Sequence, residues 1–224
     1  RGSLLRFINA PDTGMLTVSV LGENEKPRPT FILNRGVYDQ PGAAVQAAAL
    51  PTVLPFDTAK YPRNRLGLAK WTANRENPIT ARVWVNRVWQ ELFGRGLVKT
   101  GGDFGMQGSL PSHPELLDWL AVDFMENGWD TKRLIKQMVL SAAYRQSSKV
   151  TEEKLKADPE NVYLSRSTRI RLKAEVIRDW VLASSGLLHR NIGGPSVKPY
   201  QPEGLWEAAT SGRGVLATYI QDMG

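Results

Sequence analysis

The stretch NPITARVWVNRVWQELFGRGL, residues 77–97, restricts the fold more than any other part of the chain. When successive residues are placed 100° apart on a helix, Val85 and Val88 mark one apolar side. Ile79 and Val83 lie almost opposite, so the helix has two apolar sides. A helix of this kind buries both sides against neighbours. The chain therefore needs a helical core around this segment.

A polar strip of Arg82, Asn86 and Gln90 runs between the two apolar sides. An unpaired polar group in a protein interior costs about 1–3 kcal/mol, so each of these side chains must find a partner. Two interpretations stay open. The strip is either a structural hydrogen-bond network that joins the helix to the glycine-rich loop after it, or one wall of a binding cleft.

A second helix, predicted over residues 168–185, repeats the pattern. Its charged residues Glu175, Arg178 and Asp179 lie between two apolar stripes. Two helices that each carry a narrow charged strip between apolar faces can pack with the strips facing one another. We therefore expect Arg82 to contact Glu175 or Asp179.

The remaining sequence divides by its periodicity. Three short β-friendly runs, SLLRFI, MLTVSVL and TFIL, indicate a small N-terminal antiparallel β-sheet over residues 1–40. Residues 41–62 are rich in Pro, Gly and Ala, and indicate an extended connection. Residues 63–224 have a helical period interrupted by long Gly/Pro-rich loops. The sequence therefore predicts an α+β fold that is predominantly α-helical.

The side-chain inventory limits the chemistry. The chain has no cysteine, which removes disulfides, thiolate metal sites and covalent haem attachment. Two histidines are too few for a multi-histidine centre, so we expect no metal site. The net charge is +7, but the basic residues are scattered and form no nucleic-acid motif, so nucleic-acid binding is not favoured. No apolar run approaches the length of a transmembrane segment, which is about 18 residues or more.

Candidate acid–base groups are few. Asp103 and His113, in and after a glycine-rich loop, could form a metal or acid–base pair. Glu175 and Asp179 are four residues apart, a spacing that can place two carboxylates on one helix face, as glycoside hydrolysis requires. Nearby arginines favour ionised, ion-paired acids instead. The sequence identifies no reaction.

Several ordered blocks resemble one family. The longest spans residues 77–148, from NPITARVWVNRVWQELFGRGL to LIKQMVLSAAYRQSS. Others read PRPTFILNRGVYDQPG, RLKAEVIRDWVLASSG and GGPSVKPYQPEGLW. Together they cover most of residues 27–207 and are similar to the domain of unknown function 1553, which is abundant in Planctomycetes and Bacteroidetes.

The resemblance implies an exported, extracytoplasmic bacterial protein. Family members often carry a c-type haem domain upstream, so haem is expected in a separate domain and no cofactor in this chain. The family domain continues past YIQDMG, which implies a helical domain truncated at its C-terminus. The family pattern points to charged, polar and aromatic residues, namely Arg35, Tyr38, Asp39, Arg82, Asn86, Arg87, Asp103, His113, Glu175, Arg178 and Asp179.

We expect a module that binds another domain of the same polypeptide, or an extracellular glycan or anionic polymer. The predicted binding residues are Arg82, Asn86, Gln90, Glu175, Arg178, Asp179, Arg35, Asp39 and Trp206, with Trp84 or Trp89 as aromatic walls. One alternative is a hydrolase of extracellular polymers that uses Asp103, His113 or Glu175 as acid or base. Another is a docking partner of a c-type cytochrome domain. A shallow aromatic groove would favour binding, and acids that converge on a pocket would favour catalysis.

Overall fold

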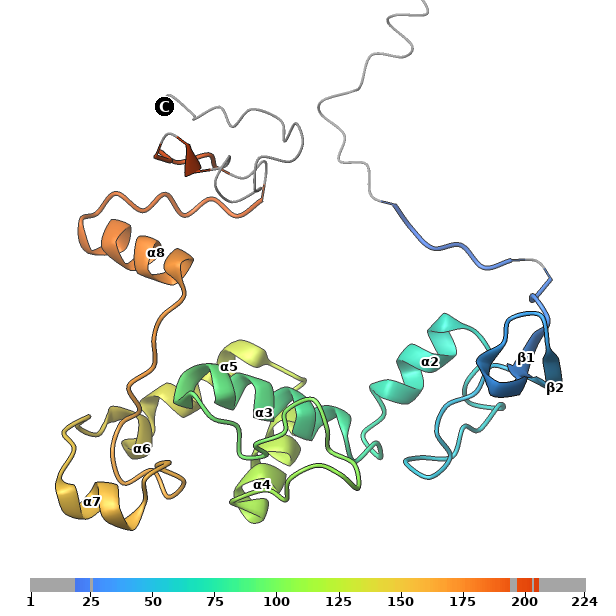
Figure 1. The fold of residues 1–224 in the computed structure, drawn as a ribbon, viewed down its shortest axis with the longest axis horizontal. Coiled ribbons are helices and arrows are strands. Elements are labelled where there is room, and N and C mark those ends of the chain that lie inside the picture. The colour runs from blue at the N-terminus through green and yellow to red at the C-terminus, as the bar shows by residue number, and fades with distance from the viewer. Residues whose placement is uncertain (1–18, 25, 194–196, 203, 206–224) are drawn as a thin grey trace, which may run out of the picture. The chain divides into compact units, whose positions relative to one another are not determined.

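The computed structural model describes residues 19–24, 26–193, 197–202 and 204–205 (Figure 1). The chain forms two compact units, Arg1–Ile170 and Arg171–Gly224. The described helices are α2 (Arg65–Thr72), α3 (Thr80–Phe93), α4 (Pro114–Glu126), α5 (Thr131–Leu140), α6 (Ala142–Arg145), α7 (Glu152–Ala157) and α8 (Ala174–Ser184). With one two-stranded antiparallel sheet, they confirm a mainly helical α+β fold.

The sheet pairs β1 (Thr30–Leu33) with β2 (Pro41–Val45). β1 is the predicted strand TFIL, whereas its partner comes from the segment expected to be an extended connection. A 3₁₀ turn over Asn34–Gly36, with Arg35 and Gly36 at positive φ, begins the reversal between them. Of the other two β-friendly runs, SLLRFI lies outside the described residues, and residues 19–21 of MLTVSVL form no strand where they are described.

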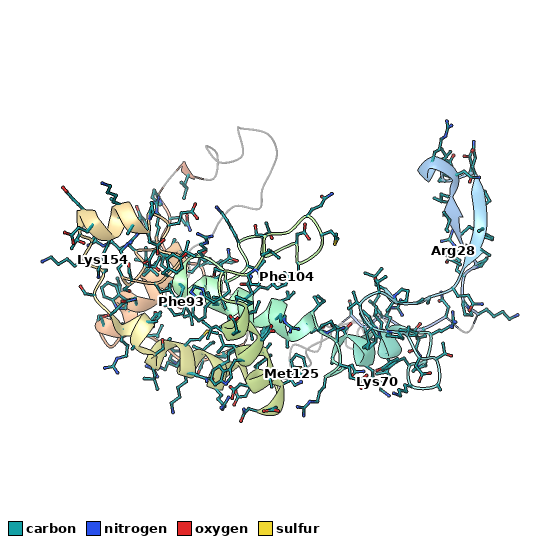
Figure 2. All side chains as sticks on the ribbon, turned by 90° about the horizontal axis from the view of Figure 1, so that it is seen from below. Arg28, Lys70, Phe93, Phe104, Met125 and Lys154 are labelled. Atoms are coloured by element: carbon teal, nitrogen blue, oxygen red, sulfur yellow. The ribbon has the colours of Figure 1, made fainter. Side chains whose placement is uncertain are left out.

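The hydrophobic core lies among α3, α4 and α5, which pack against one another (Figure 1). Buried residues of α3 recur every four positions on one side of the helix and pack against α4 and α5. The buried members are Ala81, Val85, Trp89, Phe93, Leu97, Val98, Leu117, Leu120, Ala121, Phe124, Leu134 and Met138. Phe93 belongs to this cluster, and Phe104 and Met125, also labelled in Figure 2, pack against it. One of the two apolar sides predicted for α3 therefore forms the core.

Local signals set the helix boundaries in this unit. The side-chain oxygen of Asn77 accepts hydrogen bonds from the backbone N–H groups of Ile79 and Thr80, which fixes the entry to α3. Gly94 ends α3 in the left-handed conformation, with φ of 76°. Asp130 caps α5 by accepting from Arg133 N at 3.0 Å. In the described part of the chain, every helix is too short or too polar to cross a bilayer.

α2 shows why a glycine can be required inside a helix. A Cβ atom built on Gly67 would lie 1.8 Å from the backbone oxygen of Pro62, so only glycine permits this approach. The preceding connection is also held one turn further along α2, where Trp71 Nε1 donates to Leu54 O at 2.9 Å. α2 and the segment before it are therefore joined by a close backbone approach and by a hydrogen bond from a side chain to the backbone.

α8 begins six residues later than predicted. Residues 168–173 are not helical, although their sequence has a helical period. In the first unit, Thr168 and Ile170 pack against Gly94, where an added Cβ would lie 2.4 Å from Ile170 Cγ2. Tertiary packing thus overrides the local preference for helix at these residues.

Candidate functional site

The second apolar side of α3 lines an open groove of about 560 Å³ instead of a closed core. The groove is bounded by the end of α2 and by the corner between α4 and α5. Its lining residues are Thr72, Ala73, Ile79, Thr80, Val83, Trp84, Arg87, Phe124, Trp129 and Thr131. Ile79 and Val83 are only half-buried, and Trp84 remains 43% exposed. The two-sided pattern of α3 is therefore satisfied by protein on one side only.

The hydroxyl groups of the groove are already engaged. Thr80 Oγ1 donates to Thr72 O at 2.7 Å, and Thr72 Oγ1 donates to Leu68 O at 2.9 Å. Trp84 Nε1 donates to Thr131 Oγ1 at 3.3 Å, which holds the indole ring at the groove wall. The groove consequently presents mainly apolar surface to a ligand, with its side-chain hydrogen bonds directed inward.

Trp129 forms the opposite wall of the groove and was not singled out from the sequence. Its backbone φ is 60°, which is rare outside glycine, and its backbone N–H donates to Phe124 O at 2.9 Å. Its ring meets Phe124 edge-on, with centroids 5.3 Å apart. The sequence signal was present as an aromatic residue directly after the Asn127-Gly128 helix stop, a position that no core pattern requires.

Asn86, from the predicted polar strip, is fully buried. Its side-chain oxygen accepts from Val98 N at 2.9 Å and its amide donates to Val98 O at 3.1 Å. This arrangement corresponds to the structural alternative for the strip, because Asn86 joins α3 to the chain that follows it. Gln90, one turn further along, is exposed beside Gly101.

Arg82 pairs with Asp118 of α4, an acid that the sequence did not single out. Arg82 Nε donates to Asp118 Oδ1 at 2.6 Å, and Arg82 Nη1 donates to Pro78 O at 2.5 Å. The hydrogen bond from Arg82, helped by its charge, lowers the pKa of Asp118 below its ordinary 3.8 against a smaller opposing effect of burial. The pair lies beside a pocket of about 260 Å³ between α3 and α4.

This pair predicts a pH-dependent contribution to stability. Because the folded-state pKa of Asp118 is below its unfolded value, the stabilisation is complete above about pH 4 and is lost as pH falls through the folded-state pKa. Both side chains are partly solvated, 34% and 53% exposed, so solvent screening limits the contribution to about 0.3–1 kcal/mol. Urea unfolding of wild type and Asp118→Asn should differ by this amount at pH 6 and converge near pH 2. A constant difference between the two proteins would rule out the ion pair as the cause.

The other predicted binding residues are on elements that do not line this groove within the first unit, or belong to other parts of the chain. Arg35 and Asp39 are exposed in the connection between β1 and β2. Glu175, Arg178 and Asp179 are exposed on α8, in the second unit. The contact between Arg82 and these acids stays a prediction. Trp206 lies outside the described residues.

Asp103 and His113 each contribute to local structure. Asp103 Oδ1 accepts from Gly105 N at 2.7 Å and closes a turn of the loop after α3. His113 Nδ1 lies 3.0 Å from Ser112 Oγ. The two candidates share no hydrogen bond in the part of the chain that the structure describes. Among those residues, no three metal-ligating side chains come together either.

Comparison with known proteins places the chain in a family. Searches of curated proteins and of solved structures found no match. A family model with the description "PSD1: Protein of unknown function (DUF1553)" matches residues 64–222, which is more than half of the chain. The match agrees with the resemblance of the sequence blocks from residue 77 onward, whereas the block PRPTFILNRGVYDQPG precedes the matched residues. The helical core and the α3 groove both fall within the matched residues. The chain therefore belongs to the DUF1553 family.

Proposed function

We propose that this chain is a docking module that binds an apolar segment of a protein partner in the groove beside α3. The observation that carries the proposal is the uncovered second side of α3, where Val83 and Trp84 line a groove of apolar character. An aromatic-walled apolar concavity is the usual form of a protein or ligand anchor site.

The hydrogen bonding of the groove favours a protein segment over a glycan. Sugar hydroxyls need donors and acceptors, and an unpaired buried polar group is costly. The threonine hydroxyls of the groove already bond to Thr72 O, to Leu68 O and to the indole of Trp84. Aliphatic and aromatic side chains of a partner would meet no such cost.

The charge of the groove indicates which kind of partner segment it would bind. Arg87 is the charged residue among those that line the groove, and the chain carries a net charge of +7. Complementary charge guides partners into register and raises the rate of association. The expected partner segment therefore has apolar anchors followed by an acidic residue that can reach Arg87.

The dimensions suit a short helical segment. The lining residues from Thr80 to Arg87 cover two turns of α3, about 10 Å of groove length. Helix-in-groove recognition uses anchors at i, i+3 or i+4 and i+7, which span a similar length. We propose that the partner is another domain of the same exported polypeptide, a c-type haem domain among the candidates. The family resemblance supports this extracytoplasmic setting.

Site-specific photo-crosslinking in the full-length natural protein tests the proposal. A benzoylphenylalanine in place of Trp84 keeps an aromatic ring in the groove and reacts with whatever lies against it. We expect a crosslink to an apolar peptide with a nearby acidic residue, identified by mass spectrometry. The charge reversal Arg87→Glu should reduce the crosslink yield by about tenfold or more.

Trp119 supplies the matched control. It is 55% exposed on α4 and does not line the groove. The same photoreactive residue in place of Trp119 should give no crosslink to that peptide. Equal labelling from both positions, or a crosslink to glycan instead of peptide, would reject protein docking at this groove.

A further inference from the structure

Another pocket, of about 290 Å³, lies between the C-terminal end of α3 and residues 160–170, all within the first unit. Its lining is mixed: polar and charged residues alternate with six apolar ones, Trp89, Phe93, Leu97, Val162, Leu164 and Ile170. The rings of Trp89 and Phe93 stack 4.0 Å apart, which makes this part of the lining rigid. Phe93 is labelled in Figure 2. The pocket is separate from the α3 groove, and no lining residue is shared.

Two glycines place Arg95 at the mouth of this pocket. Gly94 has φ of 76° and contacts Ile170 so closely that a Cβ could not fit. A Cβ on Gly96 would lie 2.5 Å from Val98 O. Because both flanking residues are tightly packed, the backbone of Arg95 is fixed and its side chain reaches the pocket mouth, 31% exposed.

The segment that contributes Val162 to the pocket wall is held by a buried acid and a buried arginine, Asp158 and Arg166, each 7% exposed and neither itself in the lining. The carboxylate of Asp158 accepts from Val162 N and Tyr163 N, both at 2.8 Å. Burial raises the pKa of Asp158, but these hydrogen bonds and the charge of Arg166 outweigh that effect and lower it. Arg166 in turn donates to the carbonyls of Asp158 and Pro159, both at 3.0 Å. The wall is therefore ordered without a ligand.

Positive charge predominates at the mouth of the pocket. Glu160 is paired with both Arg95 and Lys99, the latter at 3.3 Å. Hydrogen bonding from Lys99, then the charges of Lys99 and Arg95, lower the pKa of Glu160 and keep it ionised. Arg169 also lines the pocket, is exposed, and has no ion-pair partner among the residues that the structure describes. Two cations, Arg95 and Arg169, thus line the pocket beside one carboxylate, Glu160, which Lys99 also pairs from outside the lining. This excess of positive charge opposes the partial negative charge at the end of α3.

We propose that this pocket binds a carboxylate attached to an apolar body, with Arg169 and Arg95 holding the carboxylate. The planar guanidinium group forms two parallel hydrogen bonds to a carboxylate, which suits Arg169 because no described residue pairs with it. The apolar lining residues accept the body of the ligand, and the volume fits a single ring or one amino-acid side chain.

Two classes of ligand carry a carboxylate on an apolar body. The ligand is either a free small organic acid or the C-terminal carboxylate of a peptide chain, and both present the same group to Arg169. Phenylacetate represents the first source and N-acetylglycylphenylalanine the second. Their neutral amides are the matched probes, since they keep the apolar body and lose the charge.

Isothermal titration calorimetry with these four probes tests the site in the full chain. We expect at least one of the two acids to bind at least about tenfold more tightly than its amide, because charge-assisted hydrogen bonds are lost in the amide. Whichever acid binds more tightly identifies the source. Equal binding of acids and amides, or no binding of any probe at millimolar concentration, would overturn the proposal.

Three variants should change the affinity for the acid in different directions, which a merely structural role of these residues would not produce. Arg169→Gln should weaken acid binding by about tenfold or more without changing the fold, since Arg169 is exposed and forms no ion pair within the described part of the chain. Glu160→Gln should strengthen it, because the substitution releases Arg95 and removes a competing negative charge. Arg145→Gln, an exposed residue of α6 that does not line the pocket, is the control and should leave affinity unchanged. Weaker acid binding by Glu160→Gln would contradict the proposed role of the cations.

Discussion

Asn86→Ala is expected to lower the free energy of unfolding by about 2–5 kcal/mol. Asn86 is fully buried and supplies both a donor and an acceptor to the backbone of Val98, itself 2% exposed. Alanine would leave the N–H and the C=O of Val98 without partners in the interior, where each unpaired group costs about 1–3 kcal/mol. Urea unfolding followed by circular dichroism measures the loss.

Gln90→Ala is the matched control for this prediction. Gln90 lies one helical turn from Asn86 on the same face of α3 but is exposed. Its substitution should change stability by no more than about 0.5 kcal/mol. Asn86→Asp should be as harmful as alanine, because a carboxylate cannot donate to Val98 O and would bury a charge. A stable Asn86→Ala protein would show that water replaces the side chain, and the structural assignment of this residue would be wrong.

Asp158→Ala is expected to destabilise the first unit by about 2–4 kcal/mol. The substitution removes the acceptor of two backbone N–H groups and leaves the buried guanidinium of Arg166 without a nearby negative charge. The loss should be largest in the segment from α7 to residue 166. Hydrogen exchange at Val162 and Tyr163, measured by NMR, should accelerate before global unfolding.

Asp57 provides a comparison in solvent, as another aspartate whose carboxylate accepts a hydrogen bond from a nearby backbone N–H. Its carboxylate accepts from Ala59 N in an exposed turn at 2.9 Å. Because water can replace that acceptor, Asp57→Ala should cost less than about 1 kcal/mol. Similar losses for Asp57→Ala and Asp158→Ala would mean that burial adds nothing at residue 158, contrary to the geometry.

The helices of the core could be predicted with good accuracy because their signals are local. The apolar period of α3 acts over one or two turns, as do the Asn77 side chain that bonds to Ile79 N before it and Gly94 that ends it. Asp130 caps α5 for the same reason. The mainly helical α+β class followed from these segments.

The strand partner and the start of α8 could not be predicted in the same way. β1 pairs with Pro41–Val45, a segment whose composition indicates only extended chain. The helical period at residues 168–173 is overridden by contacts of Thr168 and Ile170 with Gly94. Both outcomes depend on residues that are distant in the chain, and no local pattern contains that information.

The residues of the candidate site could be predicted only in part, for the same reason. The sequence established that Arg82 and Asn86 lie on a polar strip that needs partners, but the partners are Asp118 and Val98. Pairing depends on which helix packs against α3 and in what orientation. Trp129, Asp158 and Arg166 were missed because their importance comes from position in space and from no repeating pattern.

The sequence by itself determined the helices of the core and the two apolar sides of α3, because periodicity and capping act between neighbouring residues. Only the tertiary structure decided that one side joins α4 and α5 while the other remains an open groove. The same is true of Arg95 and Arg169, which both line the pocket at the C-terminal end of α3. The physical reason is that burial and charge balance at a site are sums over distant segments, which are defined only after the segments have packed.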